Sequence, residues 1–431
     1  MTKEIGVGLI GFGVIGSQVA RLLTSEKDRF QDQTGVPITL KRVKVVKADL
    51  ERPLVGIIGP SLFTTDEDDF FATPGIDIVF EAIGGEEPAF SYLKRAIASG
   101  KQAVTSNKEV IAKHGMELTV MAKEHNTSLR YEASVGGGIP IITPLKRDLV
   151  ANKIRGIYCI INGTTNYILT RMSKEDMDFV STLKSAQELG YAEPNPVNDI
   201  EGIDAAFKIA ILATLAFRKR VRPEEVYREG ISRLRSQDFR YARELGFTIK
   251  LLAMTKDDNG AIETRVHPVL LPQEHPLAKV DGVLNAIMVD GDLTGQVVFV
   301  GQGAGPLPTS SAVVADVIAA AREVISGQAE QLPLPSGDAT IKPMDDVLTR
   351  YYIRMSAADQ PGVLAQIARV LGMHQISIAS VIQKESDSKS QTAEIVIMTH
   401  QALERNMRMA IEEINELEIT QEVSNFIRVE A

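Results

Sequence analysis

The chain has 431 residues, which is enough for about three domains of ordinary size. Apolar residues make up 44% and charged residues 24%, as in an ordinary globular protein, and the net charge is −9. The absence of a basic block argues against a nucleic-acid partner, and the absence of a long apolar stretch argues against a membrane span.

A single cysteine, Cys159, excludes an intrachain disulfide and is typical of a reducing compartment. It lies in the apolar run 157–161, which predicts a small core residue rather than a nucleophile. The six histidines have no zinc-type spacing, and no targeting signal precedes the first apolar run. We therefore expect a cytoplasmic protein.

Residues 1–130 alternate apolar strand candidates, at 4–10, 38–46, 76–83 and 102–105, with helical stretches. This alternation predicts an α/β domain with a Rossmann-type, doubly wound parallel sheet that binds a dinucleotide. The regular alternation ends at about residue 130. Residues 131–326 predict an α+β domain with an antiparallel sheet for substrate binding and dimerisation.

Residues 327–347 contain three prolines and two glycines without any periodicity, which predicts a linker. Residues 348–431 follow in the order βαββαβ, the ferredoxin-like plan. Because the linker separates two complete patterns, we expect the parts on either side to fold independently.

The first strand candidate runs into a GxGxxG motif, Gly11-Phe12-Gly13-Val14-Ile15-Gly16. Between a strand and a helix, these glycines allow a tight turn, approach of the diphosphate to the backbone, and close helix–strand packing. The alternative is a glycine-rich turn in a nucleotide-free domain of the same fold. At the end of the second strand Lys47 favours NADP, whereas Asp49, two residues on, leaves NAD possible.

Two further stretches carry groups suited to catalysis. Lys108 follows a short strand at the carboxyl edge of the predicted sheet, where it is either a solvated charge or a proton donor beside the nicotinamide. Between 186 and 208, a turn with two prolines precedes Asp199, and then Asp204 and Lys208 follow at i and i+4 on one helix face. An exposed salt bridge explains that last pair but not the rigid turn that carries Tyr191 and Glu193.

Together these stretches resemble homoserine dehydrogenases. The resemblance covers about the first 325 residues and rests on four motifs in family order, at 106–108, 132–140, 162–167 and 186–208. It implies NAD(P)-dependent interconversion of L-homoserine and L-aspartate 4-semialdehyde, in the route to threonine and methionine, by a homodimer or homotetramer. The alternatives are another semialdehyde dehydrogenase on this fold, and a regulatory protein that binds nucleotide and amino acid without turnover.

The resemblance also implies roles for individual residues. Lys108 and Lys208 would be the catalytic lysines, and Lys108 would also lie at the cofactor. A lysine crowded by a second lysine and partly desolvated has a lowered pKa, which suits proton exchange with an alcohol. Glu193 would hold the substrate ammonium, and further substrate contacts would come from Tyr191, Asp199, Asp204, Gly163 and Thr164. Gly303 would lie in a loop against the cofactor.

Two regulatory or structural sites complete these implications. Glu132, with the main-chain oxygens of Val135, Gly137 and Ile139, would hold a monovalent cation, sodium; a glycine-rich hinge is the alternative. Residues 350–431 resemble an ACT domain, with Asp359 and Gly362 as candidate effector contacts. Its expected effector is threonine, and its alternative role is dimerisation without a ligand.

Overall fold

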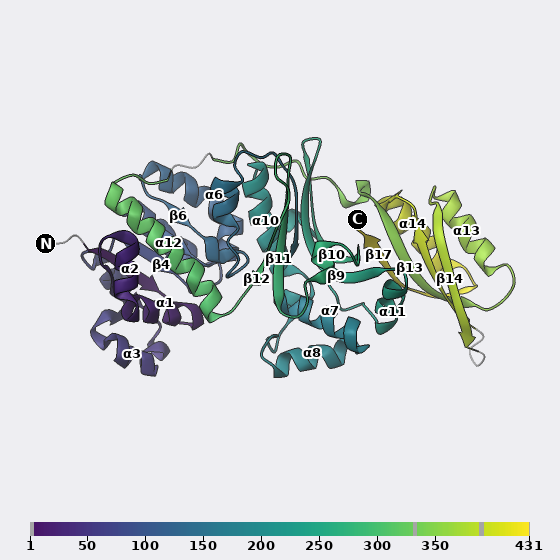
Figure 1. Ribbon diagram of the computed structural model, residues 1–431, viewed down its shortest axis with the longest axis horizontal. Coiled ribbons are helices and arrows are strands. Elements are labelled where there is room, and N and C mark those ends of the chain that lie inside the picture. Colours follow the sequence, from purple (N-terminus) through teal and green to yellow (C-terminus); the bar gives the residue numbers. More distant parts are fainter. Residues whose placement is uncertain (1–3, 331–333, 388–391, 431) are drawn as a thin grey trace. The chain divides into compact units, whose positions relative to one another are not determined.

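The computed structural model describes residues 4–330, 334–387 and 392–430, drawn in Figure 1. Its contacts divide the chain into two units. The first unit comprises the described residues up to 155, 207–224 and 285–339, and the second comprises 156–206, 225–284 and the described residues from 340. This division cuts across the boundaries expected from the sequence, and residues 331–333 of the expected linker lie outside the described part.

The first unit contains a six-stranded parallel sheet in the order β3-β2-β1-β4-β5-β6. The strands are β1 (Ile5–Ile10), β2 (Ile38–Lys44), β3 (Phe63–Thr64), β4 (Ile78–Glu81), β5 (Gln102–Thr105) and β6 (Leu129–Arg130). The predicted Rossmann-type sheet is confirmed. This strand order reverses direction between β1 and β4, where ligands of such sheets bind at the carboxyl ends.

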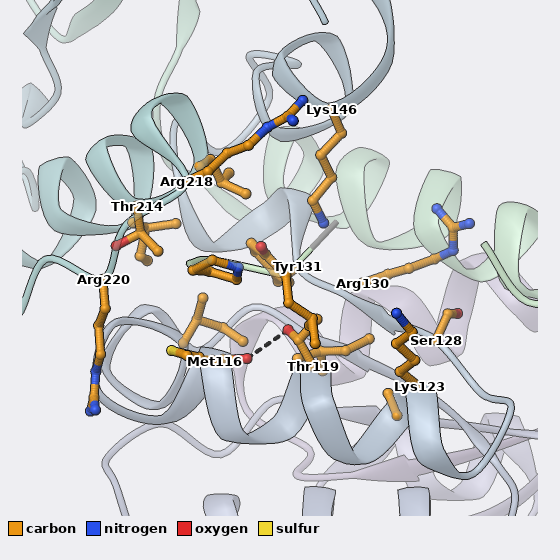
Figure 2. A pocket seen from close by; sticks show the side chains of 18 of the residues that line it. Met116, Thr119, Lys123, Ser128, Arg130, Tyr131, Lys146, Thr214, Arg218 and Arg220 are labelled. Carbon is orange, nitrogen blue, oxygen red and sulfur yellow. Dashed lines mark hydrogen bonds between the residues drawn. The ribbon is translucent and has the colours of Figure 1, made fainter. Parts of the chain in front are cut away.

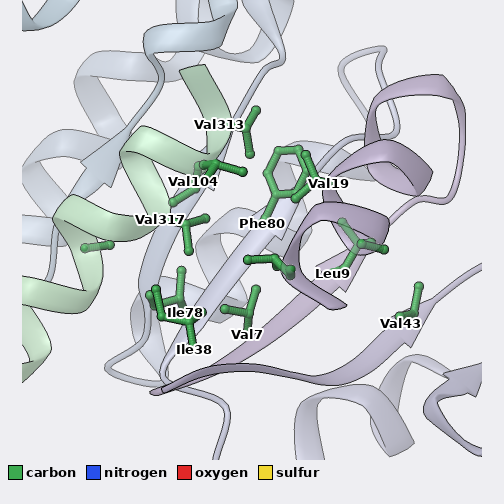
Figure 3. Close-up of a cluster of buried hydrophobic side chains, with 14 of the residues drawn as sticks. Val7, Leu9, Val19, Ile38, Val43, Ile78, Phe80, Val104, Val313 and Val317 are labelled. Carbon is green, nitrogen blue, oxygen red and sulfur yellow. The ribbon is translucent and has the colours of Figure 1, made fainter. Parts of the chain in front are cut away.

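The helices of the first unit cover this sheet. They are α1 (Val14–Ser25), α2 (Lys27–Thr34), α3 (Pro53–Ile58), α4 (Glu67–Ala72), α5 (Ala89–Ala98), α6 (Lys108–Glu124) and α12 (Pro306–Ser326). Figure 3 shows strand residues such as Val7 and Phe80 packed with Val313 and Val317 of α12. A helix from far along the chain therefore completes the core of the dinucleotide domain. The strands β11 (Leu284–Gly291) and β12 (Gly295–Gln302) also belong mainly to this unit.

The second unit contains a sheet in the order β7-β9-β10-β17-β13-β15-β14. These strands are β7 (Ile154–Ile160), β9 (Phe247–Asp258), β10 (Ala261–Pro272), β13 (Leu348–Ala358), β14 (Ile378–Asp387), β15 (Thr392–Thr399) and β17 (Thr420–Val429). The short β8 (Tyr227–Arg228) pairs with β10, and the short β16 (Ala402–Leu403) pairs with β13. The accompanying helices are α7 (Gly163–Glu175), α8 (Phe179–Glu188), α9 (Val197–Ile200), α11 (Ser236–Glu244), α13 (Val363–Met373) and α14 (Glu404–Glu416). One further helix, α10 (Ile203–Phe217), begins in this unit and continues into the first.

Cys159 on β7 is buried, and burial raises the pKa of its thiol. A buried thiol with a raised pKa is mostly protonated and therefore a poor nucleophile. The predicted role of Cys159 as a core residue is confirmed.

The C-terminal module has the predicted βαββαβ order, and its strands align as β17-β13-β15-β14. Its core packs α13 and α14 on one face of these strands through residues such as Ile353, Ile367 and Ile411. The module continues the sheet of the second unit, because β17 pairs in parallel with β10 at Val269 and Leu270.

This junction also includes a buried ion pair, so the module is joined to the rest of the second unit by more than the linker. Asp238 of α11 is fully buried and pairs with the buried Arg354 of β13, with 2.7 Å between Oδ1 and Nε. The segment before the module is also held in place, since the amide of Ile262 donates to the carbonyl oxygen of Thr340 at 2.8 Å. The sequence shows composition and period, but it does not show pairing between distant strands.

Candidate active site

The glycine-rich turn has the geometry that a dinucleotide requires. Gly11 has a φ of +96°, and a Cβ at Gly16 would lie 2.1 Å from the carbonyl oxygen of Gly11. In contrast, a Cβ at Gly13 would meet nothing within 4 Å. Gly13 is the N-cap of α1, which has no side-chain cap and no acidic residue in its first turn. No side chain of the turn therefore occupies the amides at the start of α1, which is the arrangement that binds a diphosphate in such folds.

After β2 come the charged residues Lys47, Asp49 and Arg52. Lys47 begins a short 3₁₀ helix and is exposed. The Asp49 carboxylate pairs with Arg52, with 2.7 Å between Oδ1 and Nε. Sequence reasoning weighed Lys47 against Asp49 but missed Arg52, which is identifiable only by its i+3 position on this turn.

Lys108 is the first residue of α6 and follows a braced loop at the carboxyl edge of the sheet. The hydroxyl of Thr105 donates to Oε2 of Glu81 at 2.5 Å and accepts from the amide of Asn107 at 2.9 Å. Asn107 in turn caps α6, because its Oδ1 accepts from the amides of Glu109 and Val110. These bonds fix the backbone from which Lys108 projects.

Glu81 is a functional candidate that sequence reasoning missed. It ends β4, is completely buried, and accepts from the amide of Ile83 at 2.7 Å. Burial raises the pKa of this carboxyl group. An acidic residue at the end of an otherwise apolar strand was the signal that could have identified it.

In the second unit, Asn162 brings two carboxylates together. Its Nδ2 donates to Oδ1 of Asp199 at 2.7 Å and to Oδ2 of Asp204 at 3.0 Å. Its Oδ1 accepts from the amide of Thr165 and so caps α7, the helix that begins at Gly163. Asn162 begins the motif at 162–167, but the sequence predicted no role for it. Asp204 is buried, which is not what a simple exposed salt bridge would give.

The proline-containing turn lies beside the start of α7. The hydroxyl of Thr164 donates to the carbonyl oxygen of Tyr191 at 2.6 Å, and the Tyr191 ring lies 5.0 Å from that of Tyr167. Gln187 donates to the carbonyl oxygen of Glu193 at 3.1 Å, while the Glu193 side chain is exposed. The turn is therefore held through its backbone, and its acidic side chain stays available to a ligand.

Lys208 lies one helical turn after Asp204 on α10. Residues 207–224 belong to the first unit, as Lys108 does, whereas Asp199, Asp204 and Glu193 belong to the second. The expectation that Lys208 lies within the substrate domain therefore differs from the observed division of the chain.

At the predicted cation site, the carboxylate of Glu132 accepts hydrogen bonds from three backbone amides. The Glu132 carboxylate is buried and accepts from the amides of Ile141, Ile142 and Thr143 at 2.6, 2.8 and 2.7 Å. Within the described part of the chain, no three His, Cys, Asp or Glu residues form a metal-binding group. A cation at this loop would therefore depend on main-chain oxygens such as those of Val135, Gly137 and Ile139.

The predicted cofactor loop at Gly303 packs on the same region. A Cβ at Gly137 would lie 2.4 Å from the carbonyl oxygen of Gly303, and a Cβ at Gly303 would lie 1.8 Å from Nδ2 of Asn285. The two glycines thus allow two loops to touch, which gives Gly303 a packing reason independent of any cofactor.

The predicted effector residues lie between β13 and α13. Asp359 and Gly362 are exposed, and Gly362 has a φ of +90° with open space at its Cβ position. The loop needs glycine for its conformation and leaves room for a ligand.

A doubly wound sheet with a dinucleotide turn, a lysine on a braced sheet edge and a cluster of carboxylates defines a dinucleotide-dependent oxidoreductase. Comparison with known families identifies the particular one. Residues 11–132 match the model for the NAD-binding domain of homoserine dehydrogenase, residues 140–318 match that for homoserine dehydrogenase, and residues 351–418 match that for the ACT domain. The chain belongs to the homoserine dehydrogenase family.

Individual relatives agree over the whole length. The chain is 43% identical to a homoserine dehydrogenase of Synechocystis, with 99% of each chain covered, and 41% identical to that of Neisseria gonorrhoeae, with 100% of this chain and 99% of that one covered. The solved structure of a homoserine dehydrogenase from Thiobacillus denitrificans matches with a TM-score of 0.89 and 40% identity over 99% of this chain and 98% of that chain. A hyperthermophilic archaeal homoserine dehydrogenase in complex with NADPH matches with a TM-score of 0.61 and 27% identity over 74% of this chain and 97% of its own. These matches do not favour a regulatory protein without turnover.

Proposed function

We propose that this enzyme interconverts L-homoserine and L-aspartate 4-semialdehyde, with Lys108 and Lys208 as catalytic lysines and NADP as the preferred cofactor. The observation that carries the substrate assignment is the pair of carboxylates, Asp199 and Asp204, gathered on Asn162. The buried carboxylate of Asp204, with the half-buried Asp199 and an exposed acidic turn beside it, suits a cationic substrate group, and homoserine offers an ammonium.

The proposed chemistry needs one proton to move at the substrate hydroxyl. The nicotinamide, when bound, accepts hydride from the alcohol carbon or returns it to the aldehyde. Lys208 or Lys108 takes the hydroxyl proton in oxidation, and a protonated lysine stabilises the developing alkoxide in reduction. Glu193 binds the ammonium, and the Glu81–Thr105–Asn107 network keeps the start of α6 in place.

The NADP preference rests on the cations after β2. Asp49 is neutralised by Arg52, so the residues there that face a ribose 2′ substituent carry net positive charge through Lys47. The archaeal relative solved with NADPH supports the same preference. A 2′-phosphate gains Lys47 as a charged partner here, whereas a 2′-hydroxyl lacks a free acceptor carboxylate because Asp49 is paired with Arg52.

A monovalent cation, sodium, at the main-chain oxygens of Val135, Gly137 and Ile139 stays part of the proposal. So do threonine as an effector at Asp359 and Gly362, assembly into a homodimer or homotetramer, and a cytoplasmic location. The ACT domain, with its open loop at Gly362, supports the effector proposal.

The test of the proposed function is a steady-state assay of NADP reduction, followed at the absorbance band of the reduced nicotinamide. L-homoserine is compared with L-serine, which is one carbon shorter, and with L-2-aminobutyrate, which lacks the hydroxyl. Rapid reduction with homoserine alone is expected. Equal rates with serine, or no reduction with homoserine at any cofactor concentration, would contradict the assignment.

A further inference from the structure

The first unit contains a cavity that no predicted cofactor, substrate, cation or effector residue lines. It is formed by α6, the end of α10, and the segments 127–131, 145–150 and 334–335 (Figure 2). Its volume is about 140 Å³. A single water needs roughly 10–15 Å³ of such space, so the cavity has room for a molecule of metabolite size.

The cavity is surrounded by an excess of positive charge. Six basic residues line it against one acidic residue, Glu330; they are Lys113, Lys123, Arg130, Lys146, Arg218 and Arg220. Lys113 pairs with Glu86 and Glu109, and Arg130 pairs with Glu323 and Glu330. In the described part of the chain, the other four basic residues have no carboxylate partner, although the protein as a whole has a net charge of −9.

Several of these cations are held in place rather than extended freely into solvent. Nζ of Lys146 lies 4.1 Å from the centre of the Tyr131 ring, and Nη2 of Arg220 donates to the carbonyl oxygen of Lys113 at 2.9 Å. Figure 2 shows Arg218 and Lys146 on one side of the cavity, with Arg130 and Lys123 on another. Nε of Arg130 is buried without a hydrogen-bond partner. Charged donors thus approach the same space from several elements.

The remaining wall is largely apolar. It includes Ile111, Ala112, Met116, Leu145, Ile211 and Leu215. A simple inorganic anion would leave these side chains in contact with water, whereas an organic anion would cover them and place its charge among the cations. We propose that this cavity binds a small organic anion in which a carboxylate, sulfonate or phosphate group is attached to an apolar body.

The cavity walls are the helices that carry the two lysines assigned to catalysis. Lys108 is the first residue of α6, and Lys208 lies on α10 one turn before Ile211. An occupant therefore contacts both helices at a site separate from the ACT domain. The binding proposal itself does not depend on the enzymatic assignment.

The experiment is a fluorescence titration of the full chain with anilinonaphthalene sulfonate, an aromatic anion that becomes fluorescent in apolar surroundings. Saturating NADP is present throughout, so that the dinucleotide site is not counted. The double variant Lys146→Met/Arg218→Met is compared with Lys27→Met/Arg29→Met, which removes the same charges from exposed positions on α2. We expect the cavity variant to bind the probe about five- to twentyfold more weakly, as for the loss of two ion pairs, and the control to bind as the parent does.

A second variant, Met116→Glu, puts a carboxylate into the apolar wall and should abolish binding of the probe. Inorganic phosphate should displace the probe only at much higher concentration, because it has no apolar body. Equal weakening in the control and cavity variants would overturn the site. If inorganic phosphate displaced the probe at concentrations similar to the dissociation constant of the probe, the proposed ligand class would be wrong. The double variant changes only side chains at the rim, so it decides the question if Met116→Glu does not fold.

Discussion

Replacing Arg354 with methionine tests how the C-terminal module is attached. Arg354 donates to the buried Asp238 from Nε at 2.7 Å and from Nη2 at 3.3 Å, and it also binds Glu394. Methionine fills a similar space, but the Asp238 carboxylate then stays buried without its charged partner. Removing one member of a buried pair costs about 3–5 kcal/mol of the free energy of unfolding.

The remaining partners of Asp238 set the expected magnitude. Asp238 keeps hydrogen bonds from the hydroxyl of Tyr352 at 3.3 Å, Nδ2 of Asn425 at 3.0 Å and the amide of Arg235 at 2.9 Å. These donors reduce the cost, so we expect a loss near the lower end, about 3 kcal/mol. That is a large part of the roughly 5–15 kcal/mol of a typical domain.

Lys384→Met is the matched control, because Lys384 also joins the module to α11, through Glu244, but the two side chains are 50% and 44% exposed. Its loss should cost at most about 1 kcal/mol. The assay is urea unfolding followed by far-ultraviolet circular dichroism, since the chain has no tryptophan. Equal effects of the two single variants would refute the argument.

Three further predictions concern the nucleotide, the substrate and pH. Glu193→Ala should raise the KM for homoserine roughly ten- to hundredfold, as for a lost charged hydrogen bond, and an equal rise in the KM for NADP would contradict the assignment. Lys47→Ala should weaken NADP more than NAD, and Arg52→Ala should shift the preference in the same direction because it also frees Asp49 to accept a hydrogen bond from the 2′-hydroxyl of NAD; equal loss for both cofactors would place the selectivity elsewhere. Burial and the negative charge of Glu132 raise the pKa of Asp316 from 3.8 to about 7. Between about pH 4 and pH 7 the carboxyl group of Asp316 is therefore protonated in the folded state and ionised in the unfolded state. Its contribution to stability is therefore lost as pH rises from about 4 to 7, at no more than about 1.4 kcal/mol per pH unit, and Asp316→Asn should flatten that part of the stability profile measured by urea unfolding at a series of pH values.

The sequence predicted those parts of the fold in which local pattern and tertiary structure agree. The strands β1, β4 and β5 follow runs that are buried on both faces, whereas β2 is buried only at Ile38 and Val43. The glycines of the turn at Gly11–Gly16 are required by its backbone geometry. The two-residue strands β3 and β6 are too short for any periodic signal. The strand β11 was not predicted, although its centre is apolar and buried.

The sequence could not show which side chains meet across the fold. Asn162 links Asp199 and Asp204 over about forty residues, and Glu81 braces the loop before Lys108 through Thr105. These contacts depend on strand order and helix packing rather than on spacing along the chain. The same reason explains why residues 327–347 were predicted as a linker, although their described part pairs with Arg220 and Ile262.

The central claim is that two lysines carry out the proton exchange. The measurement that tests it most directly is the kcat for homoserine oxidation by Lys108→Ala and Lys208→Ala. The matched control is Lys184→Ala, an exposed lysine on α8, and the free energy of urea unfolding is measured for each protein to show that the fold is intact. We expect kcat to fall about 10²–10⁴-fold in both lysine variants, as for a lost acid–base group, and to stay unchanged in the control. Turnover close to that of the parent enzyme in either variant would contradict it.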